Sequence, residues 1–427
     1  MSASRLNLKM FLAVQLFVLA AFGIAYAISP STSREALKRD LLQVDTFKPV
    51  PVPRVEPLRI ARNYNRPDFV SDEALATVLQ RIQPRFDRRH MKPNHIEHAL
   101  RTWGVNAEFQ NPNAVSGADM LKFLTDTASF TDSWGVEARP LLVEKPHGVS
   151  VRYGLVQGES VHHDHWLASV TEAGAPLSTP IFTPGRHGWT LGDVLQQSLQ
   201  DFRLDERETE WTAMAFGLWI SPTREWTGSG GRQYSFDLLV HRLVRGQKEI
   251  GVCSGTHRVY SLMLLVRLDD EFDILSDASR AEAWAYLEKT RDAIMESQFP
   301  DGHWPTNWAD GAAALENPRD DDLSKMVIAT GHHIEWLSIA PRELHPPEEQ
   351  IKRAIDWLVT TTAAQSKSDI MARYTFFSHV GAALANWRQQ EPATFWKNWE
   401  AEHPFDAAEE AAFNATGVTG ESTEAAH

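Results

Sequence analysis

Gln298-Phe-Pro-Asp-Gly-His-Trp304 is the most specific short element in this sequence. It follows residues 281–295, where apolar side chains recur every three or four positions, as in an amphipathic helix. Gly302 permits a left-handed turn, and Asp301 can cap the backbone amides that follow it. The ring of Trp304 is large enough to pack between two neighbouring helices. The element therefore predicts a tight turn between packed helices, which is a structural role.

This element resembles the QxxDGxW motif of the terpene cyclase and protein prenyltransferase superfamily, with Gln298, Asp301, Gly302 and Trp304 at the matching positions. The resemblance covers the motif and the paired-helix pattern of residues 208–387. It implies an α/α toroid, which is a ring of helical hairpins.

The chemistry of that superfamily is not expected here. Its cyclases use a DxDD acid motif, whereas this sequence offers only Asp269-Asp270 and Asp320-Asp321-Asp322. The zinc site of its prenyltransferases would require an aspartate two residues before Cys253, where Gly251 stands. The resemblance therefore supports the fold and not cyclase or transferase activity.

Helical periodicity dominates residues 59–404, so the fold class is expected to be mainly α. Apolar residues recur at three- and four-residue spacing in 75–82, 120–130, 189–202, 211–219, 236–244, 256–268, 281–295, 327–339, 351–359 and 370–387. One segment, 149–156, alternates apolar residues with others and predicts a small β element near 149–157.

Four segments, 94–98, 255–260, 331–336 and 377–381, each place a histidine near the start of an expected helix. They resemble degenerate repeats of one helical unit, as a ring of helical hairpins would produce. The inner helices of such a ring would direct their amino ends, with free N–H groups, toward a central cavity. Polar side chains in these segments are therefore expected to line it.

Cys253 and His257 are four residues apart and would face the same way if both were helical. A thiol at a helix amino end beside an imidazole would have a lowered pKa. Cys253 could then act as a nucleophile or, together with His257, bind a soft metal such as zinc. The alternative is that this single cysteine only packs in the core.

His332 and Glu335 lie at i and i+3, so the carboxylate could fix the tautomer of His332 for acid–base catalysis. The segment resembles the GHxxE element of the N-acylglucosamine 2-epimerase family, another helical toroid, in which this histidine transfers a proton at a sugar carbon. The second histidine of that family has an arginine nearby, and no arginine directly follows His379. That family is also expected in the cytoplasm, whereas this chain carries an export signal. An epimerase is therefore kept as the alternative and is not the preferred interpretation.

Residues 160–166 contain a further histidine cluster at an expected helix start. His162 and His165, at i and i+3, could supply two metal ligands with Asp164 as an outer partner. Exposed or capping histidines are the plainer interpretation. Trp211 and the other tryptophans nearby are expected in the core or in a cavity wall, where they could stack on sugars or enclose a prenyl chain.

Together these motifs predict one central pocket. The catalytic candidates are His332, Glu335, Cys253, His257 and Asp301, and the candidate pocket residues are His303, Trp304, Trp336 and His379. We expect an enzyme that acts on a carbohydrate or an isoprenoid lipid. The alternative is a non-catalytic binding or scaffold domain in which these histidines cap helices. An open polar cavity would favour the enzyme, and a filled apolar centre would favour the scaffold.

Arg5 and Lys9 precede an apolar run, residues 10–27, that ends in a small-x-small site at Ala25-Tyr-Ala27. About 18 apolar residues can also span a membrane as a helix. The proline-rich segment 48–54 would be a suitable spacer beyond an anchor. We therefore favour an uncleaved membrane anchor over a cleaved signal peptide. Either places the rest of the chain outside the cytoplasm.

The expected organisation is a signal or anchor (1–28), a proline-rich linker (29–58), an N-terminal helical part (59–184), the toroid core (185–404) and a disordered acidic tail (405–427).

The 42 basic and 56 acidic residues give a formal net charge of −14, without a basic run, so nucleic acid is not an expected partner.

Overall fold

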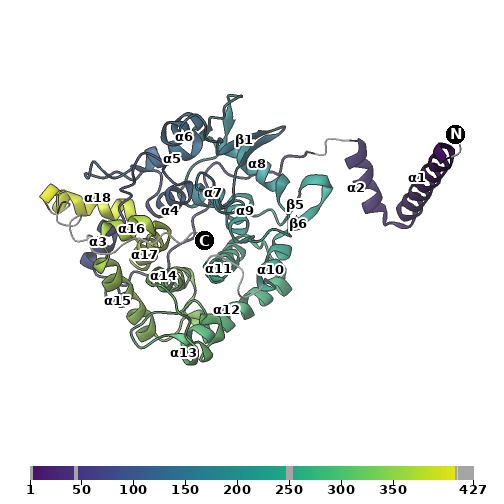
Figure 1. Ribbon diagram of the computed structural model, residues 1–427. Coiled ribbons are helices and arrows are strands. Elements are labelled where there is room, and N and C mark those ends of the chain that lie inside the picture. Colours follow the sequence, from purple (N-terminus) through teal and green to yellow (C-terminus); the bar gives the residue numbers. More distant parts are fainter. Residues whose placement is uncertain (1–2, 43–46, 247–252, 409–410, 412–427) are drawn as a thin grey trace.

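The computed structural model describes residues 3–42, 47–246, 253–408 and 411, which form a mainly helical protein with small two-stranded sheets. Along the folded body the helices alternate between an inner and an outer position (Figure 1). The inner helices are α4 (Pro93–Trp103), α7 (His165–Glu172), α9 (Glu210–Ile220), α11 (Thr256–Phe272), α14 (Leu323–Ile339) and α17 (Tyr374–Trp387).

The six inner helices contact one another in a closed cycle. In chain order, each packs against the next, from α4 to α17, and α17 packs back on α4. A helix that neighbours cover on all sides can be buried around its whole circumference. Every residue of α9 is buried, and so is every residue of α14 from Val327 to Ile339.

The outer helices are amphipathic and bury one stripe against the inner ones. α15 buries residues 351, 354, 355, 358 and 362, the spacing of a single helical face. The outer helices are α3 (Asp72–Arg81), α5 (Gly117–Thr125), α6 (Thr127–Trp134), α8 (Leu191–Asp201), α10 (Phe236–Val244), α12 (Asp277–Ser297) and α15 (Glu348–Ala364). Shorter helices are η1 (Ser229–Gly231), η2 (Trp308–Asp310), α13 (Ala313–Glu316), η3 (Arg342–Leu344), α16 (Lys367–Ala372) and α18 (Pro392–Glu402).

The tight turn predicted after α12 is confirmed. Gly302 has a φ of 110°, and a Cβ there would collide with the backbone carbonyl of Arg353 in α15. The Gln298 side chain donates to the carbonyls of Gly302 at 2.9 Å and Gln350 at 2.8 Å. Trp304 is fully buried. The turn therefore ties α12 to α15, as a structural role requires.

The predicted β element is a hairpin of β1 (Leu142–Lys145) and β2 (Gly148–Val151). The second strand ends at Val151, so the apolar alternation that continues to residue 155 belongs to a loop. Two further hairpins, β3 (Pro180–Ile181) with β4 (Trp189–Thr190) and β5 (Glu225–Thr227) with β6 (Gln233–Ser235), were not predicted. Strands of two or three residues are too short to show an alternating pattern.

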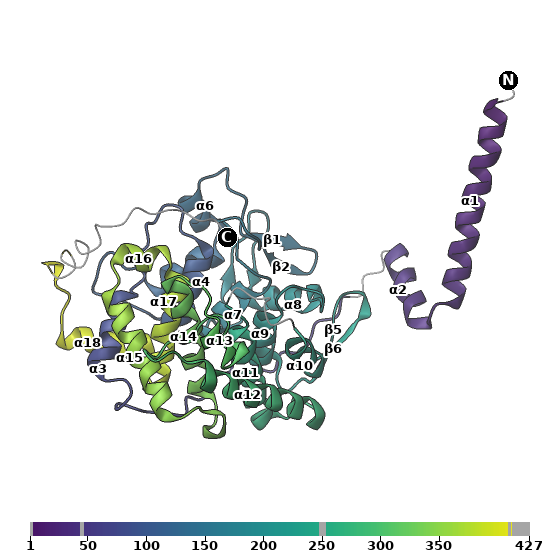
Figure 2. The ribbon, with the colours of Figure 1, turned by 60° about the horizontal axis from the view of Figure 1, so that its bottom comes forward.

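The N-terminal helix α1 (Ala3–Ile28) extends away from the folded body and is followed by α2 (Ser31–Leu42) (Figure 2). Residues 8–28 of α1 are long and apolar enough to cross a membrane, and none of the apolar window is buried. This helix is consistent with a signal sequence or an anchor.

An extended segment, residues 54–66, crosses the carboxyl ends of the inner helices, and we call it the strap. The Leu58 amide donates to the Leu218 carbonyl at 3.0 Å, and the Tyr64 hydroxyl donates to the Ala340 carbonyl at 2.7 Å.

The expected boundary between the linker and the N-terminal helical part, at residue 59, falls within the strap. The predicted N-terminal part contributes α4 and α7 to the same cycle as the predicted core. Within the expected acidic tail, residues 409–410 and 412–427 lie outside the described residues.

Candidate functional site

Each inner helix places one aromatic side chain at the centre of the cycle, and these six rings form a closed circuit. The distances between successive ring centroids are 4.7 Å (His98 to His165), 4.2 Å (to Trp211), 4.4 Å (to His257), 4.5 Å (to His332), 3.9 Å (to His379) and 5.1 Å (back to His98). We call this set the histidine layer. The four histidine-bearing segments singled out in the sequence therefore do meet.

The helix positions differ from those expected. Gly331 lies in the middle of α14, so His332 is not at a helix start. α7 begins at His165, so His162 and His165 do not share a helical face. His165 joins the histidine layer, and His162 lies outside it, beside Glu208 at 3.3 Å.

Cys253 approaches the histidine layer from a turn before α11. Ser254 and Gly255 both have positive φ, and the helix starts only at Thr256, so the expected helical i, i+4 relation with His257 is wrong. The two residues are nevertheless brought together. Potential ligand atoms of Cys253, His257 and His332 all lie within 4.8 Å of one another. These buried residues could bind a metal. Gly251, which stands where the prenyltransferase zinc site would require an aspartate, lies outside the described residues.

Glu335 orients two of the histidines. Its Oε2 atom lies 3.0 Å from Nδ1 of His332 and 3.1 Å from Nδ1 of His379. An ionised carboxylate can only accept hydrogen bonds, so Nδ1 of His332 carries the proton and its Nε2 has a free lone pair. The Nε2 atoms of His257, His332 and His379 are buried without a hydrogen-bond partner. Unpartnered nitrogens of this kind suit metal ligation.

The histidine layer is uncharged. Burial lowers the pKa of His257, and the neighbouring His332 lowers it further. The pKa values of His98, His165, His332 and His379 are lowered as well, in each case mainly by burial. Neutral imidazole is the form that binds metals.

The expected low pKa of the Cys253 thiol is wrong. Burial raises its pKa well above the ordinary value, and the nearby Glu208 and Glu335 raise it further. The structure therefore does not support a free thiolate nucleophile at this position. A bound metal would be needed to deprotonate the thiol.

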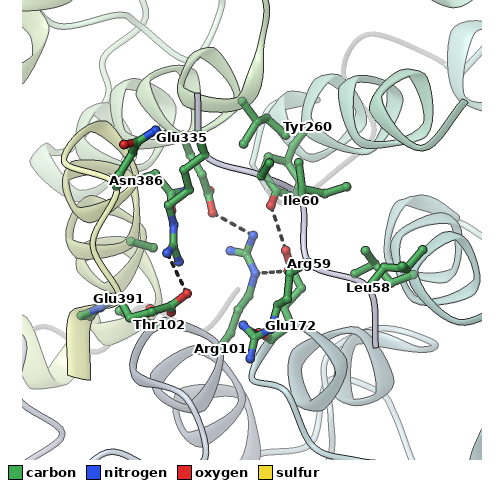
Figure 3. Close-up of a pocket in the computed structure, with 17 residues that line it drawn as sticks. Leu58, Arg59, Ile60, Arg101, Thr102, Glu172, Tyr260, Glu335, Asn386 and Glu391 are labelled. Carbon is green, nitrogen blue, oxygen red and sulfur yellow. Dashed lines mark hydrogen bonds and ion pairs between the residues drawn. The ribbon is translucent and has the colours of Figure 1, made fainter. Parts of the chain in front are cut away.

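A second layer of polar side chains lies next to the histidine layer, toward the strap (Figure 3). Arg101 is its centre, since it is almost fully buried between two carboxylates. Its Nε donates to Glu172, and its Nη2 lies 2.8 Å from Oε1 of Glu335. The Tyr260 hydroxyl donates to the other oxygen of Glu172 at 2.8 Å.

Charge pairing holds this second layer ionised. Burial lowers the pKa of Arg101, but Glu172 and Glu335 outweigh it and raise the pKa well above the ordinary value. Burial would raise the pKa of Glu335, but the charge of Arg101 and the hydrogen bonds from His332 and His379 hold it well below its usual range. A carboxylate that stays ionised is an orienting group rather than a general acid.

No motif in the sequence predicted Arg101, Glu172 or Tyr260 as site residues. A signal was present, because Arg101 follows His98 by three residues and Tyr260 follows His257 by three. The pair His332 and Glu335 has the same spacing. One helical turn thus separates the two layers on each of these helices.

The remaining predicted site residues lie elsewhere. Asp301 is largely exposed and accepts from Nδ1 of His303 at 2.7 Å, and His303 stacks on Phe299. Trp304 donates to the Ile294 carbonyl at 2.8 Å. Trp336 donates to Nδ1 of His333 at 3.0 Å on another face of α14. These contacts are those of packing and turn residues.

Asp164 serves the structure as an inter-helix link. It accepts from Ser198 of α8 at 2.6 Å and from Thr212 of α9 at 2.7 Å, and it lies 3.2 Å from Nδ1 of His163. Glu206 is 2.9 Å from the same nitrogen.

No family model, curated protein or solved structure matches this chain.

Proposed function

We propose that this chain is a membrane-tethered, extracytoplasmic zinc enzyme with an α/α toroid fold, acting on a carbohydrate or an isoprenoid. The observation that carries the proposal is the convergence of Cys253, His257 and His332, whose potential ligand atoms lie within 4.8 Å of one another. The closed cycle of six inner helices, each contributing one ring to the histidine layer, supports the toroid.

The donor set favours zinc. One thiolate and two imidazoles are ligands that zinc accepts readily, and a soft sulfur donor disfavours magnesium and calcium. Among the described residues this group has three members, and a second group, His332, Glu335 and His379, shares His332 with it. Structural zinc sites usually take four protein ligands, whereas catalytic sites take three and leave a position for water. Zinc here would supply activated water, so hydrolysis is the expected reaction class.

Two further features fit a reactive centre. His98 and His257 retain 7% and 8% of their exposed surface, so the histidine layer is not completely sealed. Glu335 holds His332 in the tautomer that leaves Nε2 free. A carboxylate in this position is the usual outer partner of a zinc-bound histidine. The centre is polar rather than filled with apolar side chains, which speaks against a purely scaffolding role.

Metal analysis of the full chain, purified in detergent without added metal, tests the proposal. We expect one equivalent of zinc in the unmodified protein and loss of zinc in Cys253→Ala, His257→Ala and His332→Ala. His333→Gln is the matched control, since His333 is equally buried on α14 but contacts Trp336. Circular dichroism would confirm that each variant is folded. Metal-free protein, or equal loss of zinc in His333→Gln, would overturn the proposal.

The second candidate is metal-free acid–base catalysis by His332 and His379, as in the epimerases. One observation favours it. Arg101 lies 3.0 Å from Nδ1 of His379, so the fold supplies the arginine that the sequence lacks directly after this histidine. The two rings are only 3.9 Å apart between centroids, which leaves no room for a sugar carbon between them. We therefore prefer zinc, and sugar epimerisation by metal-free protein would reverse that preference.

A further inference from the structure

A cavity of about 410 Å³ lies between the strap and the carboxyl ends of the inner helices (Figure 3). Its volume falls within the range of about 300–1,000 Å³ that is typical of small-molecule sites. Arg101, Glu172, Tyr260 and Glu335 line it on the side of the histidine layer. The cavity therefore borders the proposed zinc centre through Glu335, whose other oxygen contacts the histidines.

The charged side chains that line this cavity balance one another. They are three arginines and three glutamates: Arg59, Arg62, Arg101, Glu172, Glu335 and Glu391. Arg101 pairs with Glu172 and Glu335, and Arg62 lies 2.7 Å from Glu391. Arg59 donates instead to the backbone carbonyl of Glu172 at 2.9 Å. A charged ligand at the paired groups would have to break an ion pair before it gained a partner, and the lining has no net charge that would favour an anion or a cation.

The lining also excludes a purely apolar ligand. An isoprenoid chain would cover the six arginine and glutamate side chains and remove their remaining hydration without offering hydrogen bonds. Hydroxyl groups can do both tasks that the lining requires, since they donate to carboxylates and accept from guanidinium groups. Aliphatic side chains, including Leu58, Leu218 and Ala382, supply an apolar wall for the C–H face of a sugar ring.

We propose that this cavity binds a neutral mono- or disaccharide. The inference rests on the proposed function only in taking that sugar to be the substrate, because the binding site itself involves no proposed zinc ligand. Arg101 and the two carboxylates are held in place by one another before the sugar binds, so their hydrogen-bonding groups are pre-organised. The strap forms one wall, since Leu58, Arg59, Ile60 and Arg62 all line the cavity.

Saturation-transfer NMR on the full chain, in a detergent without a sugar headgroup, tests the proposal. The probes are glucose, N-acetylglucosamine, maltose, cellobiose and chitobiose, compared with glucuronate, inorganic phosphate and farnesol. We expect binding of at least one neutral sugar. Ala382→Phe would fill the cavity from α17 and weaken that binding at least tenfold. Ala281→Phe, an exposed alanine of α12, is the matched control and should bind normally.

Three results would overturn the inference: no neutral sugar binding at millimolar concentration, binding of only phosphate or farnesol, or unchanged sugar binding in Ala382→Phe. The same titration on His257→Ala separates the two proposals. Sugar binding that persists in that variant, in protein found to contain no zinc, would leave the cavity assignment standing while the zinc enzyme fails.

Discussion

Oε1 of Glu335 lies 2.8 Å from Nη2 of Arg101, while Oε2 of the same carboxylate contacts His332 and His379. One side chain thus joins the cavity to the histidine layer. Its ionisation is fixed by Arg101, and its position fixes the tautomer of His332. The two layers are therefore expected to respond together when this residue is changed.

Glu335→Gln should weaken zinc binding by about 10–100-fold, the usual effect of removing an outer partner of a metal-bound histidine. The amide has one acceptor oxygen and cannot satisfy two histidines and Arg101 together. Competition with a chromophoric chelator would measure the affinity. Glu172→Gln is the control, because Glu172 also contacts Arg101 and none of its observed hydrogen bonds is to a histidine. Equal losses in both variants would contradict this role of Glu335.

Arg101→Met should destabilise the protein by about 3–5 kcal/mol, because it leaves the buried carboxylate of Glu335 and the 14% exposed carboxylate of Glu172 without their cation. The side chain of Arg101 is 7% exposed, and that of Glu335 is 2% exposed. The comparison is Arg66→Met, which removes ion pairs to Asp68 and Glu348, both 58% exposed, and should cost about 1 kcal/mol or less. Urea unfolding followed by circular dichroism would measure both. Similar midpoints for the two variants would be inconsistent with a buried charge cluster.

The sequence predicted the local parts of this site well and the long-range parts less well. The turn at Gly302 is encoded within seven residues, so a motif suffices to predict it. The convergence of His257, His332 and His379 depends on how helices far apart in the chain pack, and repeated histidines near helix starts only suggested it. Arg101 could have been found from its three-residue spacing after His98, but its partners Glu172 and Glu335 depend on tertiary packing.

Burial explains the clearest error. The residues next to Cys253 in the sequence suggested a helix amino end, and a thiol at such an end has a low pKa. In the structure the helix begins only at Thr256, three residues after Cys253, and the thiol is buried, which reverses the direction of the pKa shift. A sequence without its tertiary contacts does not show how strongly a group is desolvated.

Gly302→Ala should destabilise the protein more than Gly135→Ala does. Both glycines have positive φ, at 110° and 85°, so alanine costs about 1–3 kcal/mol at each for the backbone alone. Only at Gly302 would the added methyl group also collide with the Arg353 carbonyl, and overpacking typically adds about 1–3 kcal/mol. Thermal unfolding would compare them. If the two variants have the same melting temperature, the turn does not lock α12 against α15.

His163 makes stability depend on pH at alkaline values. Burial lowers its pKa, but Asp164 and Glu206 outweigh this and raise it from 6.5 to about 11. Protonated His163 therefore stabilises the folded protein. This contribution is complete below pH 6.5, the pKa of histidine in the unfolded chain, and is lost progressively as pH rises toward 11. The pKa of Asp164 is lowered from 3.8: burial alone would raise it, but His163 lowers it more. That contribution is lost only when pH falls below 3.8.

His163→Gln keeps a donor for Asp164 but removes the charge. The difference in melting temperature between unmodified protein and this variant should therefore be largest between about pH 4 and 6.5 and should shrink steadily up to pH 10. Taking the difference cancels the titration of groups that the substitution does not affect. A difference that is constant from pH 6 to 10, or that grows with pH, would mean that His163 is neutral in the folded protein and that its contacts with Asp164 and Glu206 are ordinary hydrogen bonds.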